Sequence, residues 1–478
     1  MKKFLNNILK TFFGNIVSLT TGILVGFFIP KMMGLVGYAY YKTYTLYLTY
    51  IALASLGLGD GMLLKFAGKD RDQLNPETIR YYLHRYYIQI ALLFCVSLVM
   101  CLALVDTESQ FIVVALCFTI ISSQTVSVHQ NISMLTNNFG EYSKRIIIKS
   151  ICTALFVLAL FIAYKLTGNE VSYQVYVVGI MTIEYALALW YVYTYKDFNF
   201  GRGRRSPDDE SYFRMLYIGF PLLLSNMAGT IFMTLDRQYV SILFPKESYA
   251  VYAFAYNMLT LITTMTSAIS HVLFPSMRKI ENMDIKAYMQ KYLTIFSILV
   301  CACMIVYFPL SVIVMWFLDK YTGSIEILRI VLPGLVISSC VTVIFFNFYK
   351  LENRVKQYFA KTVISIAFSA LMNYLAWIIF HDYRAISWAS IISLVFWFVL
   401  VGELFVRKYR VNFIRIILYI GAMCLSFYGL TYLVSNPYLG ALVYFATFII
   451  ITWIIYPDKL KDVYLLAIHK IRKRQGVS

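Results

Sequence analysis

One face of the apolar segment 213–243 carries four polar residues, Asn226, Thr230, Thr234 and Arg237. Spacings of four, four and three keep these side chains on one side of an α-helix. Inside a membrane such a stripe must face protein or water, because a polar group against lipid costs several kcal/mol. A guanidinium also binds a phosphate through two parallel hydrogen bonds. Two roles are therefore possible for Arg237. It could attract a phosphate inside the membrane, or it could form with Asp236 an interfacial pair that reaches the outer surface.

Three other apolar segments carry polar stripes of the same kind. We interpret the four stripes together as the lining of a hydrophilic cavity. The alternative is ordinary hydrogen bonding between helices by Ser, Thr and Asn, which is common in membrane bundles. The additional predicted lining residues are Asn15 and Ser18 in 11–33, Ser123, Ser127 and Gln130 in 111–133, and Asn257, Thr264 and His271 in 249–273.

Three carboxylates are candidates for coupling transport to a proton or a cation. Glu184 lies near the middle of the segment 171–193, where a carboxylate must be neutral or paired with another helix. It is equally compatible with pairing to a buried Arg or Lys. Asp236 precedes Arg237, and adjacent residues on a helix diverge by about 100°, so we expect no simple neutralisation. Asp60 lies near a segment end, which favours contact with the interface.

Helices that cross a membrane must position these residues. With 60% apolar and 14% charged residues, the chain does not have the composition of a soluble globule. About 20 apolar residues cross a bilayer as a helix. We predict an all-α integral membrane protein with fourteen transmembrane helices at about 11–33, 44–64, 86–105, 111–133, 146–166, 171–193, 213–243, 249–273, 293–318, 326–348, 360–380, 386–406, 413–434 and 437–456.

The basic residues give the orientation of these helices. Most of the 42 Lys and Arg residues lie on alternate loops, on the side of both termini, and Arg237 lies inside a segment. Such a bias marks the cytoplasmic side, so we predict two cytoplasmic termini and an even number of spans. The net charge of +18 then orients helices and meets anionic membrane lipids, and we predict no nucleic-acid partner.

Several classes of function are excluded by what the sequence lacks. All eight cysteines lie inside apolar segments, without the spacing of a zinc or iron–sulfur site. No phosphate-binding glycine loop or nucleophile motif is present. Outer loops such as 106–110 and 435–436 are too short for a catalytic domain. We predict no cofactor, no metal and no enzymatic activity.

A weak internal repeat suggests how the helices are grouped. Pro30-Lys31 ends the first segment and Pro245-Lys246 ends the seventh, and tyrosines follow in both places. Six spans separate the two motifs, so the repeat is parallel, as in transporters with a site between two halves. We predict an N-terminal six-helix bundle over 1–193, a cytoplasmic linker over 194–212, a second six-helix bundle over 213–406, and two extra helices with a basic tail over 407–478.

Several loose motifs, spread over most of the chain, resemble polysaccharide-transport flippases. These belong to the superfamily that also holds multidrug-and-toxin (MATE) exporters and peptidoglycan lipid flippases. The entry to the twelfth segment, 382–387, departs from the Gly-rich pattern of that family, and the 40 tyrosines are unusually many. The motifs are Ile29-Pro30-Lys31-Met32-Met33-Gly34, Gly37-Tyr38, Leu56-Gly57-Leu58-Gly59-Asp60, Leu235-Asp236-Arg237, Tyr249–Tyr256, Phe274-Pro275, and Ile327-Leu328-Arg329 through Pro333.

The resemblance implies a MATE-like fold and a flippase in a cell membrane, in all expectation a bacterial one. Its substrate would be an oligosaccharide linked to a polyprenyl diphosphate, moved to the outer leaflet by alternating access. Its partners would be that lipid-linked substrate, membrane lipids and other polysaccharide-assembly proteins. Two alternatives stay open: a cation-coupled multidrug exporter of the same fold, and a membrane-embedded polysaccharide polymerase or ligase, which usually needs a large outer loop.

Overall fold

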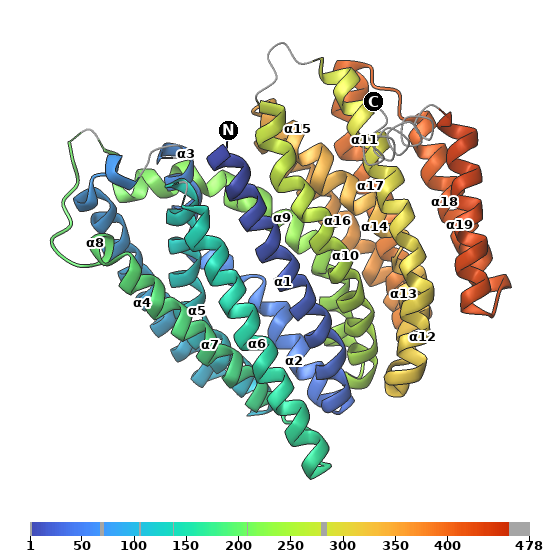
Figure 1. Ribbon diagram of the computed structural model, residues 1–478, viewed down its shortest axis with the longest axis horizontal. Helices are drawn as coiled ribbons and strands as arrows, with labels where there is room; N and C mark the ends of the chain where they lie inside the picture. The colour runs from blue at the N-terminus through green and yellow to red at the C-terminus, as the bar shows by residue number, and fades with distance from the viewer. Residues whose placement is uncertain are drawn as a thin grey trace, which may run out of the picture. The chain divides into compact units, whose positions relative to one another are not determined.

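The computed structural model describes residues 2–66, 71–104, 107–136, 138–207, 209–278 and 284–457. Side chains of 2–13, Asn15, 102–108 and 264–278 lie outside the described part, as do those of Asp72 and Phe139. Within the described residues the chain is helical and contains no strand (Figure 1). The fold is therefore the predicted all-α membrane fold.

The helices match the predicted apolar segments in order and position. The first group comprises α1 (Lys2–Met32), α2 (Leu35–Leu48), η1 (Ile51–Ser55), α3 (Leu58–Phe66), η2 (Arg71–Gln73), α4 (Pro76–Leu104), α5 (Thr107–Leu135), α6 (Phe139–Thr167), α7 (Tyr173–Thr194) and α8 (Lys196–Asn199). Then follow α9 (Tyr212–Leu243), α10 (Lys246–Arg278), α11 (Ile285–Cys303), η3 (Met304–Val306), α12 (Tyr307–Phe317), η4 (Asp319–Tyr321), α13 (Ser324–Val331), α14 (Gly334–Ser339), η5 (Cys340–Phe345), α15 (Phe346–Leu351), α16 (Val355–Phe380), α17 (Tyr383–Tyr409), α18 (Ile414–Leu433) and α19 (Pro437–Ile455).

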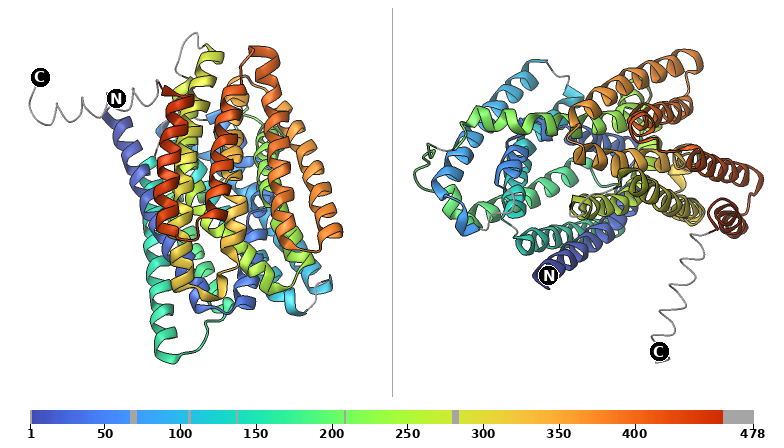
Figure 2. Two further views of the ribbon diagram at one scale, coloured as in Figure 1. Left: turned by 90° about the vertical axis from the view of Figure 1, so that its right-hand side faces the viewer. Right: turned by 90° about the horizontal axis from the view of Figure 1, so that it is seen from above.

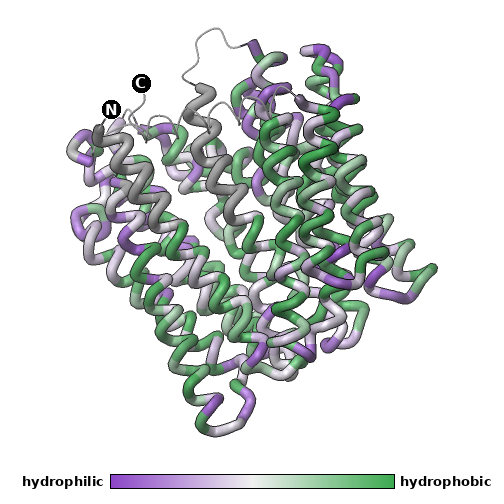
Figure 3. Tube along the Cα trace, turned by 45° about the vertical axis from the view of Figure 1, so that its right-hand side comes forward, coloured by the Kyte–Doolittle hydropathy of each residue, from purple (hydrophilic) through white to green (hydrophobic). Residues whose placement is uncertain are grey.

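The described residues contain 11 helices that are long and apolar enough to cross a membrane, or 12 if one bent pair counts as a single span. The other two predicted spans fall on α1, of which Ile16–Met32 is a shorter apolar helix, and on α10. Figure 3 shows hydrophobic residues along the lengths of the helices and hydrophilic ones at their ends. The chain is a multi-pass membrane protein, and the count of fourteen spans stays a prediction.

Local sequence explains where helices start, stop and break. Ser172 and Ser211 each accept a hydrogen bond from the first turn of the helix that follows, which satisfies a donor with no partner inside the helix. Gly168 ends α6 in the left-handed conformation that glycine adopts without strain. Leu56 and Gly57 both have positive φ between η1 and α3, where the chain bends by 55°.

The chain divides into two compact units by its contacts. The first contains Met1–Asn257 and Arg354–Ile386. In it α1 packs on α6, α5 packs on α4 and α7, and both α3 and α16 pack on α9. Its core is rich in buried tyrosine, including Tyr82, Tyr86, Tyr191 and Tyr195.

The second unit contains Met258–Asn353 and Ser387–Ser478. Here α18 and α19 lie side by side and pack on α11 and α12 (Figure 2). Tyrosines fix them, since Tyr428 donates to the Ile330 carbonyl and Tyr444 to the Cys301 carbonyl, each at 2.8 Å. Phe345 in the π-helical turn η5 packs on three other phenylalanines, Phe398, Phe405 and Phe413. The predicted grouping into two six-helix bundles and a two-helix addition stays a prediction.

Candidate functional site

The last two turns of α9 hold an acid and a base next to each other. Asp236 is buried, and its side chain is only 6% exposed, whereas that of Arg237 is 22% exposed. The apolar sequence around them keeps α9 helical, and the face with these residues meets α2 and the first turns of α10. A charged pair at this depth must be held by protein groups, because lipid offers none.

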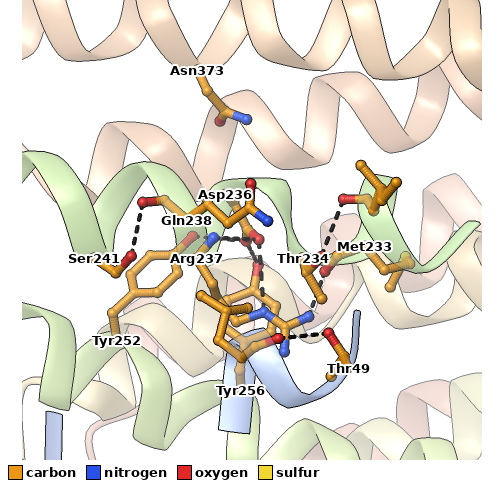
Figure 4. A network of polar contacts seen from close by, with 12 residues as sticks. Thr49, Met233, Thr234, Asp236, Arg237, Gln238, Ser241, Tyr252, Tyr256 and Asn373 are labelled. Carbon is orange, nitrogen blue, oxygen red and sulfur yellow. Dashed lines mark hydrogen bonds and ion pairs between the residues drawn. The ribbon is translucent and has the colours of Figure 1, made fainter. Parts of the chain in front are cut away.

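Four donors surround the Asp236 carboxylate. Its Oδ1 accepts the backbone N–H of Arg237 at 2.7 Å, and the Arg237 Nε lies 3.8 Å from the same oxygen. Its Oδ2 accepts the hydroxyls of Tyr252, at 2.9 Å, and of Tyr256. Both tyrosines come from α10, so the carboxylate joins two helices (Figure 4). These donors hold the carboxylate in one position between α9 and α10.

Arg237 turns back along its own helix. Its Nη2 donates to the Met233 carbonyl, and its guanidinium lies over the Tyr256 ring, 4.6 Å from the centroid. Stacking on an aromatic face stabilises a cation that is partly removed from water. The expected divergence of adjacent residues is thus overcome by the length of the arginine side chain, which brings Nε back towards Asp236.

A second cation, Lys42, comes from α2. Its ammonium donates to Asn257 Oδ1 at 2.8 Å and lies 5.3 and 5.2 Å from the ring centroids of Tyr38 and Tyr41. Asn257 directly follows Tyr256, over whose ring the Arg237 guanidinium lies. Lys42 falls just before the predicted segment 44–64, and the structure places it within α2 of the first unit.

Tyr50 connects α2, which carries Lys42, to α9, which carries Arg237. It follows α2 directly, and its hydroxyl forms hydrogen bonds with Thr234 Oγ1 and with Gln238 Nε2 of α9. Thr234 in turn donates to the Thr230 carbonyl at 2.8 Å. The result is a continuous polar cluster of α2, α9 and α10, which we define as Lys42, Tyr50, Thr234, Asp236, Arg237, Gln238, Tyr252, Tyr256 and Asn257.

The charge of this polar cluster limits its chemistry. It contains two cations and one carboxylate, and both cations are partly exposed whereas the carboxylate is buried. Its donors include an ammonium, a guanidinium and amide groups, all suited to phosphate or sugar oxygens. Within the described residues, no group of three His, Cys, Asp or Glu side chains could hold a metal ion. The arrangement suits electrostatic binding of an anion.

The structure brings only part of the predicted cavity lining into the polar cluster. Thr234, Arg237 and Asn257 belong to it. Thr230 donates to the carbonyl of Asn226 at 3.2 Å, and Asn226 itself is exposed on α9. Side chains of three predicted residues, Asn15, Thr264 and His271, lie outside the described part of the chain.

The remaining predicted lining residues lie on other helices of the first unit. Ser123 and Gln130 are partly exposed on α5 and Ser127 is exposed. Ser18 is partly exposed on α1, which packs on α6. Their predicted roles as lining residues remain predictions.

The polar residues next to the α5 stripe serve the packing of the first unit. Gln124 donates to the Ile51 carbonyl at 2.5 Å and accepts the Tyr86 hydroxyl at 2.7 Å. The Ile51 carbonyl lies in η1, the irregular turn before the 55° bend, so the amide of Gln124 satisfies an acceptor there.

The other two candidate carboxylates have separate surroundings. Glu184 of α7 forms an ion pair with Lys149 of α6, so the partner that the sequence reasoning required for a buried carboxylate is present. Asp60 lies in the first turn of α3 and is partly exposed. Neither belongs to the polar cluster, and a coupling role for either remains a prediction.

Sequence reasoning missed three residues around the site. Lys42 is an isolated basic residue close to apolar sequence, and Tyr50 is one of 40 tyrosines, so its residue type alone does not single it out. Asn373 of α16 is fully buried and is drawn in Figure 4 on a separate helix from Asp236 and Gln238. It belongs to a buried stripe of α16 with Thr362, Ser365 and Ser369, a periodicity that the sequence does contain.

Comparison with solved structures identifies the fold. "Lipid II flippase MurJ, inward closed conformation" matches with a TM-score of 0.71 and 13% identity, covering 95% of this chain and 100% of that one. An inward-facing multidrug resistance MATE family transporter matches at a TM-score of 0.55 and 16% identity, covering 86% and 95%. A MOP superfamily transporter from Pyrococcus furiosus matches at 0.57 and 14%, covering 87% and 96%. The MATE-like fold is thereby confirmed.

Comparison of sequences identifies the family. No curated protein sequence matches the chain. The family model described as polysaccharide biosynthesis protein matches residues 2–281, more than half of the chain. The solved structures that share the fold are described as a flippase and as transporters. The chain belongs to the polysaccharide biosynthesis protein family.

Proposed function

We propose that the protein is a flippase that moves an oligosaccharide linked to a polyprenyl diphosphate from the cytoplasmic to the outer leaflet. The observation that carries this proposal is the polar cluster, in which Lys42 contacts Asn257 and Arg237 lies over the adjacent Tyr256, inside a membrane protein of this family. A diphosphate carries negative charge across the apolar interior only if cations replace its water. Two cations on neighbouring helices suit that requirement.

The fold supports a lipid-linked substrate. A lipid II flippase is among the matching structures, and lipid-linked substrates share a polar head and a tail that can stay in the bilayer. The proposed movement is alternating access, with the helices of 1–193 and 213–406 rocking about a central site. We further propose that α18 and α19 border the opening through which the tail leaves. Both termini are proposed to be cytoplasmic, in a cell membrane, as the charge bias predicts.

Asp236 is the carboxylate best placed to couple flipping to a proton or cation. It shares its oxygens with Arg237 and two tyrosines, so a change in its charge would act directly on the cation proposed to hold phosphate. A buried ionisable residue with several partners is a common feature of coupled transporters. Glu184 pairs with Lys149 and Asp60 lies on α3, and we rank them lower.

The test is flipping by the purified full-length chain in vesicles. A fluorescent polyprenyl-diphosphate oligosaccharide is added, and its exposure on each leaflet is followed with an impermeant quencher. We expect Arg237→Ala to slow flipping by about 10-fold to 100-fold, since a hydrogen bond to a charged group contributes about 1.5–3 kcal/mol.

Arg407→Ala is the matched control, because Arg407 is an exposed arginine whose partner is Glu403 on its own helix. It should flip at the rate of the unchanged protein. Equal rates for Arg237→Ala and Arg407→Ala would refute a role of the polar cluster, and absence of flipping by the unchanged protein would refute the function.

The alternative of a multidrug exporter shares the fold. Cationic drugs need an acidic, aromatic site, whereas the polar cluster has two cations against one carboxylate. We therefore place it second. Drug efflux from vesicles, with no movement of lipid-linked sugar, would reverse this order.

A further inference from the structure

The segment between α8 and α9 exposes a group of arginines that flipping does not explain. Arg202, Arg204 and Arg205 are all exposed, and they follow one another within four positions. The loop runs along the outside of the first unit, at the left of Figure 1. Its composition predicts a flexible linker, because it is rich in Gly and Arg. Its contacts instead hold it against α4, and we call it the docked loop.

Hydrogen bonds hold the backbone of the loop on α4. Arg80 donates from Nε to the Asp197 carbonyl at 2.7 Å and from Nη1 to the Arg202 carbonyl at 3.3 Å. The Arg204 N–H donates to the Glu77 carbonyl at 3.2 Å. The backbones of the arginines are thus fixed on both sides of Gly203.

Gly203 allows this close approach. A Cβ atom at position 203 would lie 2.7 Å from the backbone nitrogen of Tyr81, which is closer than atoms can approach. Gly201 has φ of +108°, a conformation that favours glycine. Both glycines are therefore needed where they stand, and the loop has one preferred path over α4.

The helix before the loop is fixed as firmly. Asn199 accepts the Tyr87 hydroxyl at 2.7 Å and donates to His129 at 2.9 Å. Asp197 accepts two hydrogen bonds from Arg71, which also lies over the ring of Tyr195. These contacts connect α8 to α4, α5 and the end of α7, so the arginines project from a rigid support.

Nearby carboxylates are engaged elsewhere. Asp197 pairs with Arg71, Asp209 accepts the Thr78 hydroxyl at 2.8 Å, and Glu210 lies 3.7 Å from the Lys65 ammonium. Glu77, whose backbone carbonyl accepts the Arg204 N–H, has an exposed side chain. These carboxylates therefore leave the positive charge of the three arginines without an ion pair among the residues that the structure describes.

The exposed aromatic residues beside the loop indicate where the membrane surface lies. Tyr193 is 73% exposed, Phe200 63% and Phe213 75%. Aromatic side chains of this kind favour the headgroup level of a bilayer. Arg202 follows Phe200 by two residues, so we expect the guanidinium groups near the depth of the lipid phosphates. This placement favours lipid over a soluble acidic partner.

We propose that the docked loop 200–205 is a preformed binding surface for the phosphates of anionic phospholipids. Arg202, Arg204 and Arg205 supply the cations, Phe200 supplies an apolar contact, and the fixed backbone presents them together. Guanidinium groups bind phosphate through paired hydrogen bonds. Near an anionic leaflet each basic residue strengthens binding by about fivefold. The surface is separate from the polar cluster, so its binding does not depend on the proposed flipping.

The test is lipid binding to the purified full-length chain, measured by native mass spectrometry without flippase substrate. Palmitoyl-oleoyl phosphatidylglycerol is the probe, and phosphatidylcholine with the same tails is the neutral reference. We expect the preference for phosphatidylglycerol to fall about tenfold or more when Arg202, Arg204 and Arg205 are all changed to Gln. The matched control changes Lys286, Lys291 and Lys356 to Gln, which removes the same charge from other exposed positions, and should keep the preference.

A second variant tests the docking itself. Gly203→Val keeps all three arginines but cannot follow the path over α4, so it too should lose most of the preference. If Gly203→Val binds as the unchanged protein does, or if the lysine control loses as much as the arginine variant, the preformed surface is refuted. The same holds if a poly-glutamate peptide binds through these arginines more tightly than phosphatidylglycerol, since that result would indicate an acidic protein partner.

Discussion

At the scale of single residues, the polar cluster shows how a membrane protein keeps two cations in its interior. Asp236 does not simply cancel Arg237, because it also accepts two tyrosine hydroxyls from α10. Arg237 stacks on one of those tyrosines, and Lys42 is held by Asn257 of the same helix. Each cation thus has protein partners, and each keeps part of its surface exposed.

Substitutions at Asp236 separate its charge from its hydrogen bonds. Asp236→Ala leaves two tyrosine hydroxyls without their acceptor, and we expect it to lower the free energy of unfolding by about 1.5–3 kcal/mol. Asp236→Asn keeps an acceptor and should cost less stability, yet it should abolish flipping as fully as Asp236→Ala if the charge is needed. The measurements are thermal unfolding in detergent and the vesicle assay.

Ile242→Ala provides the control for these variants, since Ile242 is exposed on the same helix and is not a predicted lining residue. It should leave both stability and flipping close to those of the unchanged protein. Normal flipping by Asp236→Asn would contradict a coupling role for this carboxylate and leave it a structural one.

How far the sequence predicts this site depends on the kind of signal. Arg237 could be found, because a basic residue inside an apolar segment on a polar stripe is conspicuous. Lys42 could not be found, because its position near a segment end is equally compatible with a loop. Only the packing of α2 against α9 and α10 shows that this lysine belongs to the site. The ion pair of Glu184 with Lys149 needs the register of two helices, which no single-helix pattern contains.

At the scale of elements, the bend between α2 and α3 depends on glycine in contact with glycine. Gly57 has φ of +87°, and a Cβ there would lie 2.7 Å from the backbone of Gly219 and Phe220. A Cβ on Gly219 would lie 2.0 Å from the Gly57 carbonyl oxygen. The backbone at the start of α3 therefore touches the backbone of α9 directly.

Alanine at these positions should destabilise the protein. Gly57→Ala carries the strain of a positive φ in addition to the clash, and Gly219→Ala carries the clash, so we expect losses of roughly 1–3 kcal/mol in the free energy of unfolding. Gly421→Ala is the control, because nothing lies within 4 Å of a Cβ there and its backbone is helical.

Thermal unfolding of the purified variants gives the comparison. The control should be unchanged or slightly stabilised, by up to about 1 kcal/mol, as expected for Gly to Ala within a helix. If Gly57→Ala and Gly219→Ala unfold at the same temperature as Gly421→Ala, α3 and α9 are not in the close contact described.

Element positions were more predictable than element shape. Every apolar segment of the sequence corresponds to helix, because a run of about 20 apolar residues has no other stable form in a bilayer. The break at Leu56–Gly57 and the π-helical turn η5 do not follow from hydrophobicity. Both depend on tertiary partners: Gln124 on the carbonyl of Ile51, and the phenylalanines around Phe345.

At the scale of the whole molecule, the charge bias and the helices can be tested against each other. The structure contains 11 or 12 candidate spans in its described residues, and the sequence predicts fourteen. Both termini lie on the same side only if the true number is even. An error of one span would move every following basic loop to the opposite side, where the positive-inside bias disfavours it.

Reporter fusions along the chain decide the topology. We expect green fluorescent protein to be fluorescent when fused after Arg205, after Asn353 and at the C-terminus, because these positions lie on the basic side. Alkaline phosphatase should be active after Gly168 and after Asn436, in the short loops of the opposite side. Each reporter is placed at every one of these positions, so the inactive reporter at a site controls for expression of the active one.

Alkaline phosphatase activity after Arg205 would contradict the orientation and with it the lipid contact proposed for the docked loop. Activity at the C-terminus alone would instead show an odd number of spans, and would place the error among the helices after Asn353.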